Sequence, residues 1–307
     1  MTDDTPDPRA LVGRREWEGL RSAHRRRAED LLRPVIERRR RGERHPVDDF
    51  LFDYYTLRPG QLLAWHPGVE RVLEDAAAEF GGLRFHRVSG QRVEVDAGGV
   101  LERRAATIDW IERLLTAVGG RPASFGCFGM HEWAMVYGLR PGQSRHPQLP
   151  LRVDPETVRR TVDQVGLRCT HFDAFRFFTP DAAPQNALTL TRDSQVAHDH
   201  GGCLHANMDL YKWAGKMLPL TPAEVLLDAY ELARDIRVLD MRASAYDLRG
   251  LGYEPVEVDT AAGRAEYVAQ QRSFAARAAI LRRRLVSVID LSRVVARRQA
   301  GTISAVT

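Results

Sequence analysis

Histidine and cysteine are dense in two short segments of the chain, Cys169-Thr-His171 and His198-Asp-His200-Gly-Gly-Cys203-Leu-His205. Neutral imidazole and thiolate are borderline-soft ligands that suit zinc, iron or copper. The spacing matches no zinc-ribbon or zinc-finger pattern, and histidines in polar loops are commonly solvated. We therefore expect no bound metal or other cofactor. If a metal is present, its candidate ligands are His131, His171, Cys203 and His205.

Acidic side chains on a long predicted helix form a second candidate site. Asp228, Glu231 and Asp235 share one face because they lie three and four residues apart. Repulsion between neighbouring carboxylates raises the pKa of one of them, which can prepare a general acid or base. Asp240 lies off this face, where it could project into a cleft with Arg242 and Tyr246. The alternative is a solvated face that arginines neutralise.

Three segments, HEWAMVY, THFDAFRFF and HANMDLYKW, place single charges among large aromatic side chains. Burying a charge there is costly unless the charge is paired or functional. Aromatic walls with a few charges also describe a pocket for a flat, cationic ring. The alternative is an ordinary aromatic core with ion-paired polar residues. The candidate substrate-binding residues are Trp133, Phe172, Phe175, Arg176, Tyr211, Trp213 and Arg242.

Apolar periodicity predicts that helices position these residues. A β-hairpin is expected around Ser89-Gly90, and short helical turns are expected between residues 45 and 68. The predicted fold is mainly α, a single helical domain with a small β-hairpin insertion. A basic helical arm (1–44) precedes the helical core domain (45–307). The predicted helices cover residues 14–44, 69–80, 101–118, 128–137, 155–165, 204–217, 222–246 and 261–298.

Composition narrows the class of protein. The 45 basic and 41 acidic residues give a formal net charge of +4, which allows nucleic-acid binding without requiring it. No apolar run is long enough for a membrane helix, and no signal peptide is recognisable. Three cysteines in a long chain indicate no disulfide framework. P-loop, dinucleotide-binding, HExxH and Gly-x-Ser-x-Gly motifs are absent. A cytoplasmic protein with no membrane and no protein partner is expected.

Six stretches carry a resemblance to a known family over most of the chain. They are HPVDDFLFDYYTLRPGQLLAWHPG, FGCFGMHEWAMVYGLR, RCTHFDAFRFFTP, GCLHANMDLYKWA, ELARDIRVLDMRASAYDL and GRAEYVAQQRSFAARAAILR. On these stretches the chain resembles an actinobacterial family labelled 3-methyladenine DNA glycosylase. It lacks the helix-hairpin-helix and the helical repeats of the other alkylpurine glycosylase classes.

The resemblance implies a base-excision enzyme whose partner is double-stranded DNA with alkylated bases. Such an enzyme flips the damaged base and stacks it between aromatic rings. A carboxylate then stabilises the sugar cation or activates water. Because N3-methyladenine is cationic, it is a good leaving group and gains cation–π attraction. The candidate catalytic residues, chosen on chemistry alone, are Asp240, Asp235, Asp173 and Glu132; Asp209 is a further candidate carboxylate.

Two other functions remain open at this point. One is a haem- or metal-dependent enzyme that acts on a small aromatic substrate, with His131, His171 or His205 as the ligand. The other is a non-catalytic nucleic-acid-binding protein whose basic arm contacts phosphates, with salt-dependent affinity. The arginines that would make those contacts are Arg25, Arg26, Arg27, Arg38, Arg39, Arg40 and Arg41.

Overall fold

The computed structural model describes residues 6–140, 143–144 and 146–304. Helices dominate this part of the chain, and four short strands form one sheet. The elements in chain order are β1 (Ala10–Val12), α1 (Arg14–Arg40), α2 (Phe50–Tyr54), α3 (Pro59–Leu63), β2 (Arg71–Leu73), α4 (Ala77–Phe80), β3 (His86–Ser89), β4 (Arg92–Val95), α5 (Ala97–Gly120), α6 (Met130–Ala134), α7 (Pro155–Val165), α8 (Phe172–Phe175), η1 (Ala183–Gln185), α9 (Gln195–His198), α10 (Leu204–Lys216), α11 (Ala223–Arg242), η2 (Arg249–Leu251) and α12 (Ala261–Ser304).

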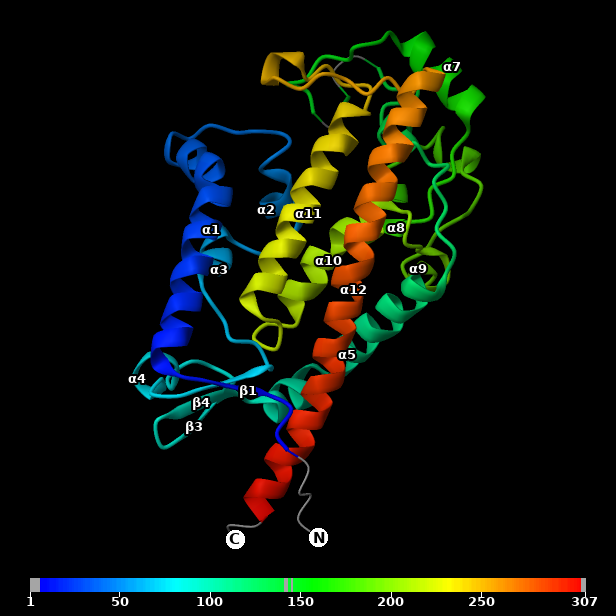
Figure 1. The fold of residues 1–307 in the computed structure, drawn as a ribbon. Coiled ribbons are helices and arrows are strands. Elements are labelled where there is room, and N and C mark those ends of the chain that lie inside the picture. Colours follow the sequence, from blue (N-terminus) through cyan, green and yellow to red (C-terminus); the bar gives the residue numbers. More distant parts are fainter. Residues whose placement is uncertain (1–5, 141–142, 145, 305–307) are drawn as a thin grey trace.

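The body of the molecule is built on its longest helices. Helix α12 runs the length of the molecule and packs against α5, α10 and α11 (Figure 1). Helix α11 also packs along α10, so residues of these two helices meet in the interior. The apolar side chains of α11 recur every three or four residues and are buried, as an inward-facing helix stripe requires. They are Val225, Ala229, Leu232, Ile236 and Leu239.

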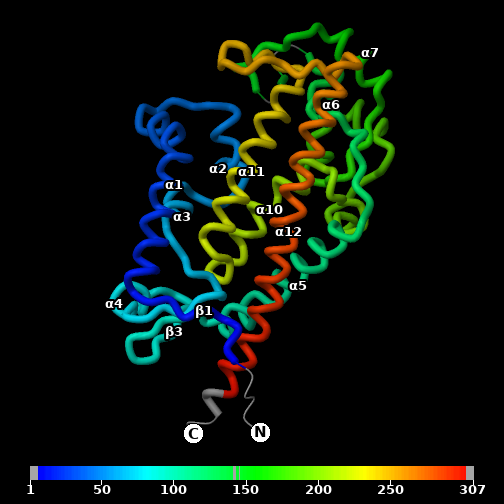
Figure 2. The backbone as a smooth tube through the Cα atoms, viewed as in Figure 1, coloured from blue at the N-terminus to red at the C-terminus, as the bar shows by residue number. Residues whose placement is uncertain are grey.

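The small sheet lies at the end of the molecule where both termini lie (Figure 2). Its strand order is β1-β2-β4-β3, with β1 parallel to β2 and the other pairs antiparallel. Gly90 joins β3 to β4 with φ 59°, a left-handed conformation that suits a hairpin turn. A second, smaller core packs here around Trp17, Trp65, Leu73, Phe80 and Val93.

The predicted fold class is confirmed: the described chain is mainly helical with a small sheet. The β-hairpin at Ser89-Gly90 is also confirmed. The helix predicted over residues 69–80 is wrong, because Arg71–Leu73 form strand β2 and only Ala77–Phe80 are helical. Strand β2 pairs with β1 and β4, and such non-local hydrogen bonds override local helical periodicity.

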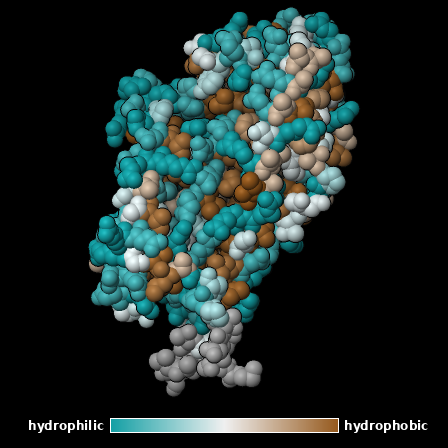
Figure 3. All heavy atoms as spheres, viewed as in Figure 1, coloured by the Kyte–Doolittle hydropathy of each residue, from teal (hydrophilic) through white to brown (hydrophobic). Residues whose placement is uncertain are grey.

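Helix α1 lies against α3 and α11 on one side of the body. The face shown in Figure 3 is mostly hydrophilic, with hydrophobic residues scattered between the elements. Within the described ranges, no helix combines the length and the apolarity that are needed to cross a bilayer.

Candidate functional site

Three imidazole rings lie side by side in the interior. His131 comes from α6, His171 directly precedes α8, and His205 lies in the first turn of α10. The ring centroids of His131 and His205 are 4.4 Å apart, and those of His171 and His205 are 5.5 Å apart. His205 is therefore the middle ring of a row. The row gathers residues that are far apart in the sequence.

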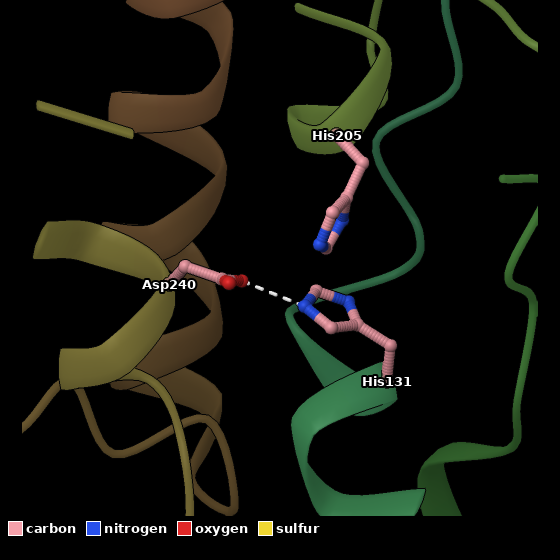
Figure 4. Close-up of side chains that lie close together, drawn as sticks. All are labelled: His131, His205 and Asp240. Atoms are coloured by element: carbon pink, nitrogen blue, oxygen red, sulfur yellow. Dashed lines mark hydrogen bonds and ion pairs between the residues drawn. The ribbon is translucent and has the colours of Figure 1, made fainter. Parts of the chain in front are cut away.

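The backbone before α6 fixes the position of His131. Gly129 adopts φ 72°, and a Cβ there would lie 3.2 Å from the Tyr267 ring and 3.3 Å from Ala243. Glycine is favoured here because the φ angle is positive and because little room is left for a Cβ atom. The turn directs His131 toward α11, whose Asp240 side chain points back at it (Figure 4).

A buried charge network holds the first end of the row. His131 Nε2 donates to Asp240 Oδ1 at 2.7 Å, and neither side chain is more than 3% exposed. Arg237, one turn before Asp240, donates through Nη1 to Asp240 Oδ2 at 3.1 Å and to Glu132 Oε1 at 2.9 Å. One guanidinium thus neutralises two buried carboxylates.

These contacts move the pKa values in opposite directions. Burial disfavours the charged imidazole of His131, but the Asp240 carboxylate outweighs burial and raises the His131 pKa well above its usual value. Burial and the neighbouring His131 push the pKa of His205 well below its usual range, so the ring of His205 is neutral. Burial raises the pKa of Glu132, although Arg237 opposes the rise.

A second network holds the other end of the row. The His171 Nδ1 atom lies 3.1 Å from both carboxylate oxygens of Asp199, which also accepts a hydrogen bond from Gln195 at 2.9 Å. His171 Nε2 lies 3.8 Å from Asp209 Oδ2. Lys212 donates to Asp209 at 3.1 Å and to Asp173 at 3.2 Å. Although burial opposes it, the Lys212 ammonium and His171 lower the pKa of Asp173.

A hollow opens onto this row of side chains. The inner cavity has an empty volume of about 430 Å³, counting the part that is open to solvent. An outer cavity of about 690 Å³, counted in the same way, shares Phe50, Tyr54 and His146 with it, so the two adjoin. The inner walls combine aromatic rings with ionisable groups: Phe50, Tyr54, Phe177, Tyr246, Glu132, Asp173, His205 and Arg237.

Two groups of ligand atoms converge closely enough to bind a metal ion. The His131, His205 and Asp240 atoms all lie within 4.8 Å of one another, and so do those of His171, Asp173 and Asp209. Within the described part of the chain, His205 makes ring contacts and no hydrogen bond. Both groups are also charge-paired: Lys212 donates to Asp173 and Asp209 in the second group, as Arg237 donates to Asp240 in the first.

Of the four predicted catalytic residues, three lie at this site. Glu132 and Asp173 line the inner cavity, and Asp240 is buried behind it next to His131. Asp235 lies elsewhere on α11, where it pairs with Arg277 at 2.8 Å. Arg242 donates to the backbone of Glu254 at 2.7 Å, outside the cavity lining.

The predicted stacking aromatics pack in or against the core. Trp133 is fully buried and donates its indole N–H to the Ala243 carbonyl at 2.8 Å. The Trp213 ring packs edge-on against Trp110, and Tyr211 is buried between two other tyrosines. Phe172, Phe175 and Arg176 lie in or next to α8, and none of them lines the inner cavity.

Sequence reasoning placed Tyr246 in a cleft near Asp240 but missed the other aromatic residues that line the inner cavity. Phe50 and Tyr54 lie four residues apart on α2, and their rings stack with a centroid distance of 5.1 Å. The spacing in DDFLFDYY was a readable signal, because residues four apart share one helix face. Phe177 gave no comparable signal, since it lies in an irregular segment.

Most of the basic arm is already neutralised. Arg27 pairs with Asp228 and Glu231 on α11, at 2.7 and 2.6 Å. Arg38 pairs with Asp48. Arg25, Arg39 and Arg41 also have carboxylate partners. Five of the seven arginines proposed for phosphate contact therefore have an acidic neighbour.

Comparison with known proteins identified no relative of this chain. No protein-family model, no curated protein and no solved structure matches the chain.

Proposed function

We propose that the protein is a metal-dependent enzyme that acts on a small ring-bearing substrate. His131, His205 and Asp240 bind one divalent transition-metal ion, and the adjoining inner and outer cavities together receive the substrate, most of which lies in the outer one. The carrying observation is the convergence of two imidazoles and one carboxylate within 4.8 Å of one another, with His131 and Asp240 buried and His205 partly exposed.

The ligand set fits this role chemically. Two histidines and one carboxylate bind zinc or iron(II) and leave coordination positions open for water or substrate. The surroundings supply the second layer of contacts that such ligands need. Arg237 donates to Asp240, and Cys127 Sγ lies 3.9 Å from His131 Nδ1. The metal would polarise a bound substrate or water, or activate oxygen if the ion is iron.

The cavity supports a small ring-bearing substrate. Phe50, Tyr54, Phe177 and Tyr246 offer ring faces and edges for stacking. Within the described chain, Arg237 Nε is buried without a hydrogen-bond partner. An unpaired donor in an aromatic cavity is suited to fix the orientation of a substrate.

Metal analysis of matched variants tests the proposal. Wild-type protein incubated with iron(II), zinc or manganese and then desalted is expected to retain one ion per chain. Asp240→Asn and His205→Ala are expected to retain almost none, whereas Asp235→Asn, changed on the same helix outside the site, keeps the wild-type content. Circular dichroism verifies folding of each variant. Wild-type protein that retains no metal, or His205→Ala that retains it fully, contradicts the proposal.

DNA glycosylase activity is the second candidate function. The observation in its favour is that the carboxyl groups of Glu132 and Asp173 line one cavity together with aromatic rings. Aromatic rings can hold a flipped cationic base, and carboxyl groups can assist the cleavage of its glycosidic bond. The resemblance to the family labelled 3-methyladenine DNA glycosylase points the same way. In this function Asp173 stabilises the sugar cation and Glu132 protonates the leaving base.

Base release from alkylated duplex DNA, measured with and without chelator, distinguishes the two functions. Release of 3-methyladenine that survives chelation and is lost in Asp173→Asn supports the glycosylase. If folded, metal-loaded protein releases no 3-methyladenine, the glycosylase function is excluded.

A further inference from the structure

Three cations converge on one buried carboxylate at the edge of the inner cavity. Arg176 Nε and Arg192 Nη2 lie 3.2 and 3.6 Å from the same atom, Asp173 Oδ1. Because both guanidinium groups approach one oxygen atom, they are close neighbours. The ammonium of Lys212 lies 3.2 Å from the other oxygen of Asp173.

The cations of this cluster outnumber its carboxylates by one. Lys212 is also paired with Asp209, at 3.1 Å, so two carboxylates are shared among three cations. The nearby imidazole of His171 does not change the balance, because it faces the carboxylate of Asp199 at 3.1 Å. The cluster therefore carries a net charge that one further anionic group would neutralise.

The two arginines keep most of their N–H donors free for a ligand. Asp173 Oδ1 has no hydrogen-bond partner in the part of the chain that the structure describes, so neither guanidinium directs an N–H group at it. Within the same residues, the Arg176 guanidinium makes one long hydrogen bond, 3.5 Å to the Tyr54 hydroxyl, and that of Arg192 makes none. The two side chains are 40% and 65% exposed, so a ligand can reach them.

Aromatic rings hold both guanidinium groups in place. The Cζ atom of Arg176 lies 4.3 Å from the ring centroid of Phe177, and that of Arg192 lies 5.4 Å from the ring centroid of Phe172. Stacking on a ring restricts an arginine side chain without consuming its N–H donors. Less side-chain freedom is then lost when a ligand binds.

Arg176 connects this pair of arginines to the substrate cavities. It contacts Tyr54, Asp173 and Phe177, which all line the inner cavity. Tyr54 lines the outer cavity as well. The two arginines therefore lie at the rim of the inner cavity, next to a residue that both cavities share.

We propose that the substrate carries one carboxylate, which Arg176 and Arg192 bind at this rim. The inference rests on the proposed function, because it names the class of substrate that the cavities receive: a ring-bearing acid. A guanidinium fork matches the two oxygens of a carboxylate. The single excess charge fits a carboxylate better than a phosphate monoester, which carries about two negative charges. The arginines select the substrate and take no part in the reaction.

Calorimetric titration of the full-length, metal-loaded protein tests the inference. The probes are benzoate, phenylacetate and phenylpropionate, each compared with its uncharged amide. At least one acid is expected to bind about 10-fold more tightly than its amide. Arg176→Gln and Arg192→Gln are each expected to raise the Kd of that acid by about 10-fold and to leave the Kd of the amide unchanged. Arg159→Gln, an exposed arginine of α7 paired with Glu156, is the control and keeps the wild-type affinity.

The other outcomes overturn the inference. Wild-type protein that binds no acid more tightly than its amide contradicts it. A preference for the acids that both arginine variants retain places the anion on the metal. Tighter arginine-dependent binding of phenyl phosphate than of any acid shows that the site is not built for a carboxylate.

Parallel titrations without metal separate this inference from the proposed function. Arginine-dependent binding of an acid by protein that retains no metal supports the carboxylate site, although the metal-dependent function has then failed. Protein that retains one ion per chain and prefers no acid leaves the metal site standing and overturns the carboxylate site.

Discussion

Arg237 links two of the buried carboxylates of the site, those of Glu132 and Asp240. It is 2% exposed, its guanidinium donates to Glu132 and Asp240, and it also lies 4.0 Å from the centroid of the Phe50 ring. Buried ion pairs add little net stability, but removal of one partner leaves the other charge uncompensated. Glu132 and Asp240 share this partner, and although Asp240 keeps its contact with His131, Glu132 has no other cationic partner in the described chain.

Substitution of Arg237 by methionine tests this dependence. We expect the free energy of unfolding to fall by about 3–5 kcal/mol, because Glu132 and Asp240 lose their common partner. Urea denaturation measures the loss. Arg234→Met is the control on the same helix, since Arg234 pairs only weakly, at 3.4 Å, with Asp235. Addition of Glu132→Gln is expected to recover part of the loss, and a fall of less than about 1 kcal/mol would argue against the network.

His66 gives the fold a dependence on pH that is separate from the site. Burial and the nearby His86 and His24 lower its pKa to about 4. The unfolded chain binds a proton at about pH 6.5, so between pH 6.5 and 4 it binds more protons than the folded chain does. Stability therefore falls as the pH falls through this window.

The contribution of His66 amounts to about 2 kcal/mol between pH 7 and pH 5. His66→Gln is expected to show a smaller decrease in unfolding free energy over this range than the wild type shows. Denaturant unfolding at the two pH values measures the difference. Equal decreases in both proteins would show that His66 is readily protonated in the folded state.

The junction between the segment before β2 and the start of α11 depends on one glycine. Gly68 has φ 70°, and a Cβ there would lie 2.6–2.8 Å from Pro222, the residue before α11. Gly68→Ala is expected to cost about 2–4 kcal/mol, from the unfavourable dihedral angle and the overlap. Thermal or urea unfolding measures this cost. Gly60→Ala, with open space around it in α3, is the matched control and is expected to be nearly neutral.

The long helices were predictable from sequence because each carries its own signal. Helix α11 shows a continuous apolar stripe. Helix α7 is preceded by the N-cap residue Asp154, whose side chain accepts a hydrogen bond from the Thr157 N–H at 2.8 Å. Strand β2 was not predictable, because three residues become a strand only through partners that are distant in the sequence. Local patterns do not encode such pairing.

The residue types of the candidate site could be predicted from the sequence, but the directions in which their side chains point could not. HEWAMVY correctly drew attention to α6, where His131 and Glu132 face the site while the neighbouring Trp133 turns into the core. A helix of five residues is too short for periodicity to show which side faces inward. The partner of Asp240 was likewise hidden, since His131 precedes it by 109 residues.

At the scale of the whole molecule, the metal-binding group connects elements that are far apart in the sequence. The proposed ligands, His131, His205 and Asp240, come from α6, α10 and α11, so an ion bound by them would stabilise the packing of all three helices. Binding to the folded chain alone adds about 2.7 kcal/mol at a free metal concentration 100-fold above the Kd. The effect is therefore global and measurable by unfolding.

Thermal unfolding with and without zinc or iron(II) tests this linkage. The midpoint is expected to rise with the concentration of the transition metal and to respond little to magnesium, which prefers oxygen ligands. Asp240→Asn is expected to lose the rise, and Asp235→Asn is expected to retain it. A rise of equal size in both variants would place the stabilising ion elsewhere.

The position of His205 has a consequence for passage through the protein. Among the residues that the structure describes, its ring alone lines both the inner cavity beside Phe50 and a second cavity lined by Cys127, Cys169 and Cys203. Replacement of this ring by a small side chain therefore enlarges both cavities with a single substitution, and it gives a solute that enters beside Phe50 more room on the side of the cysteines.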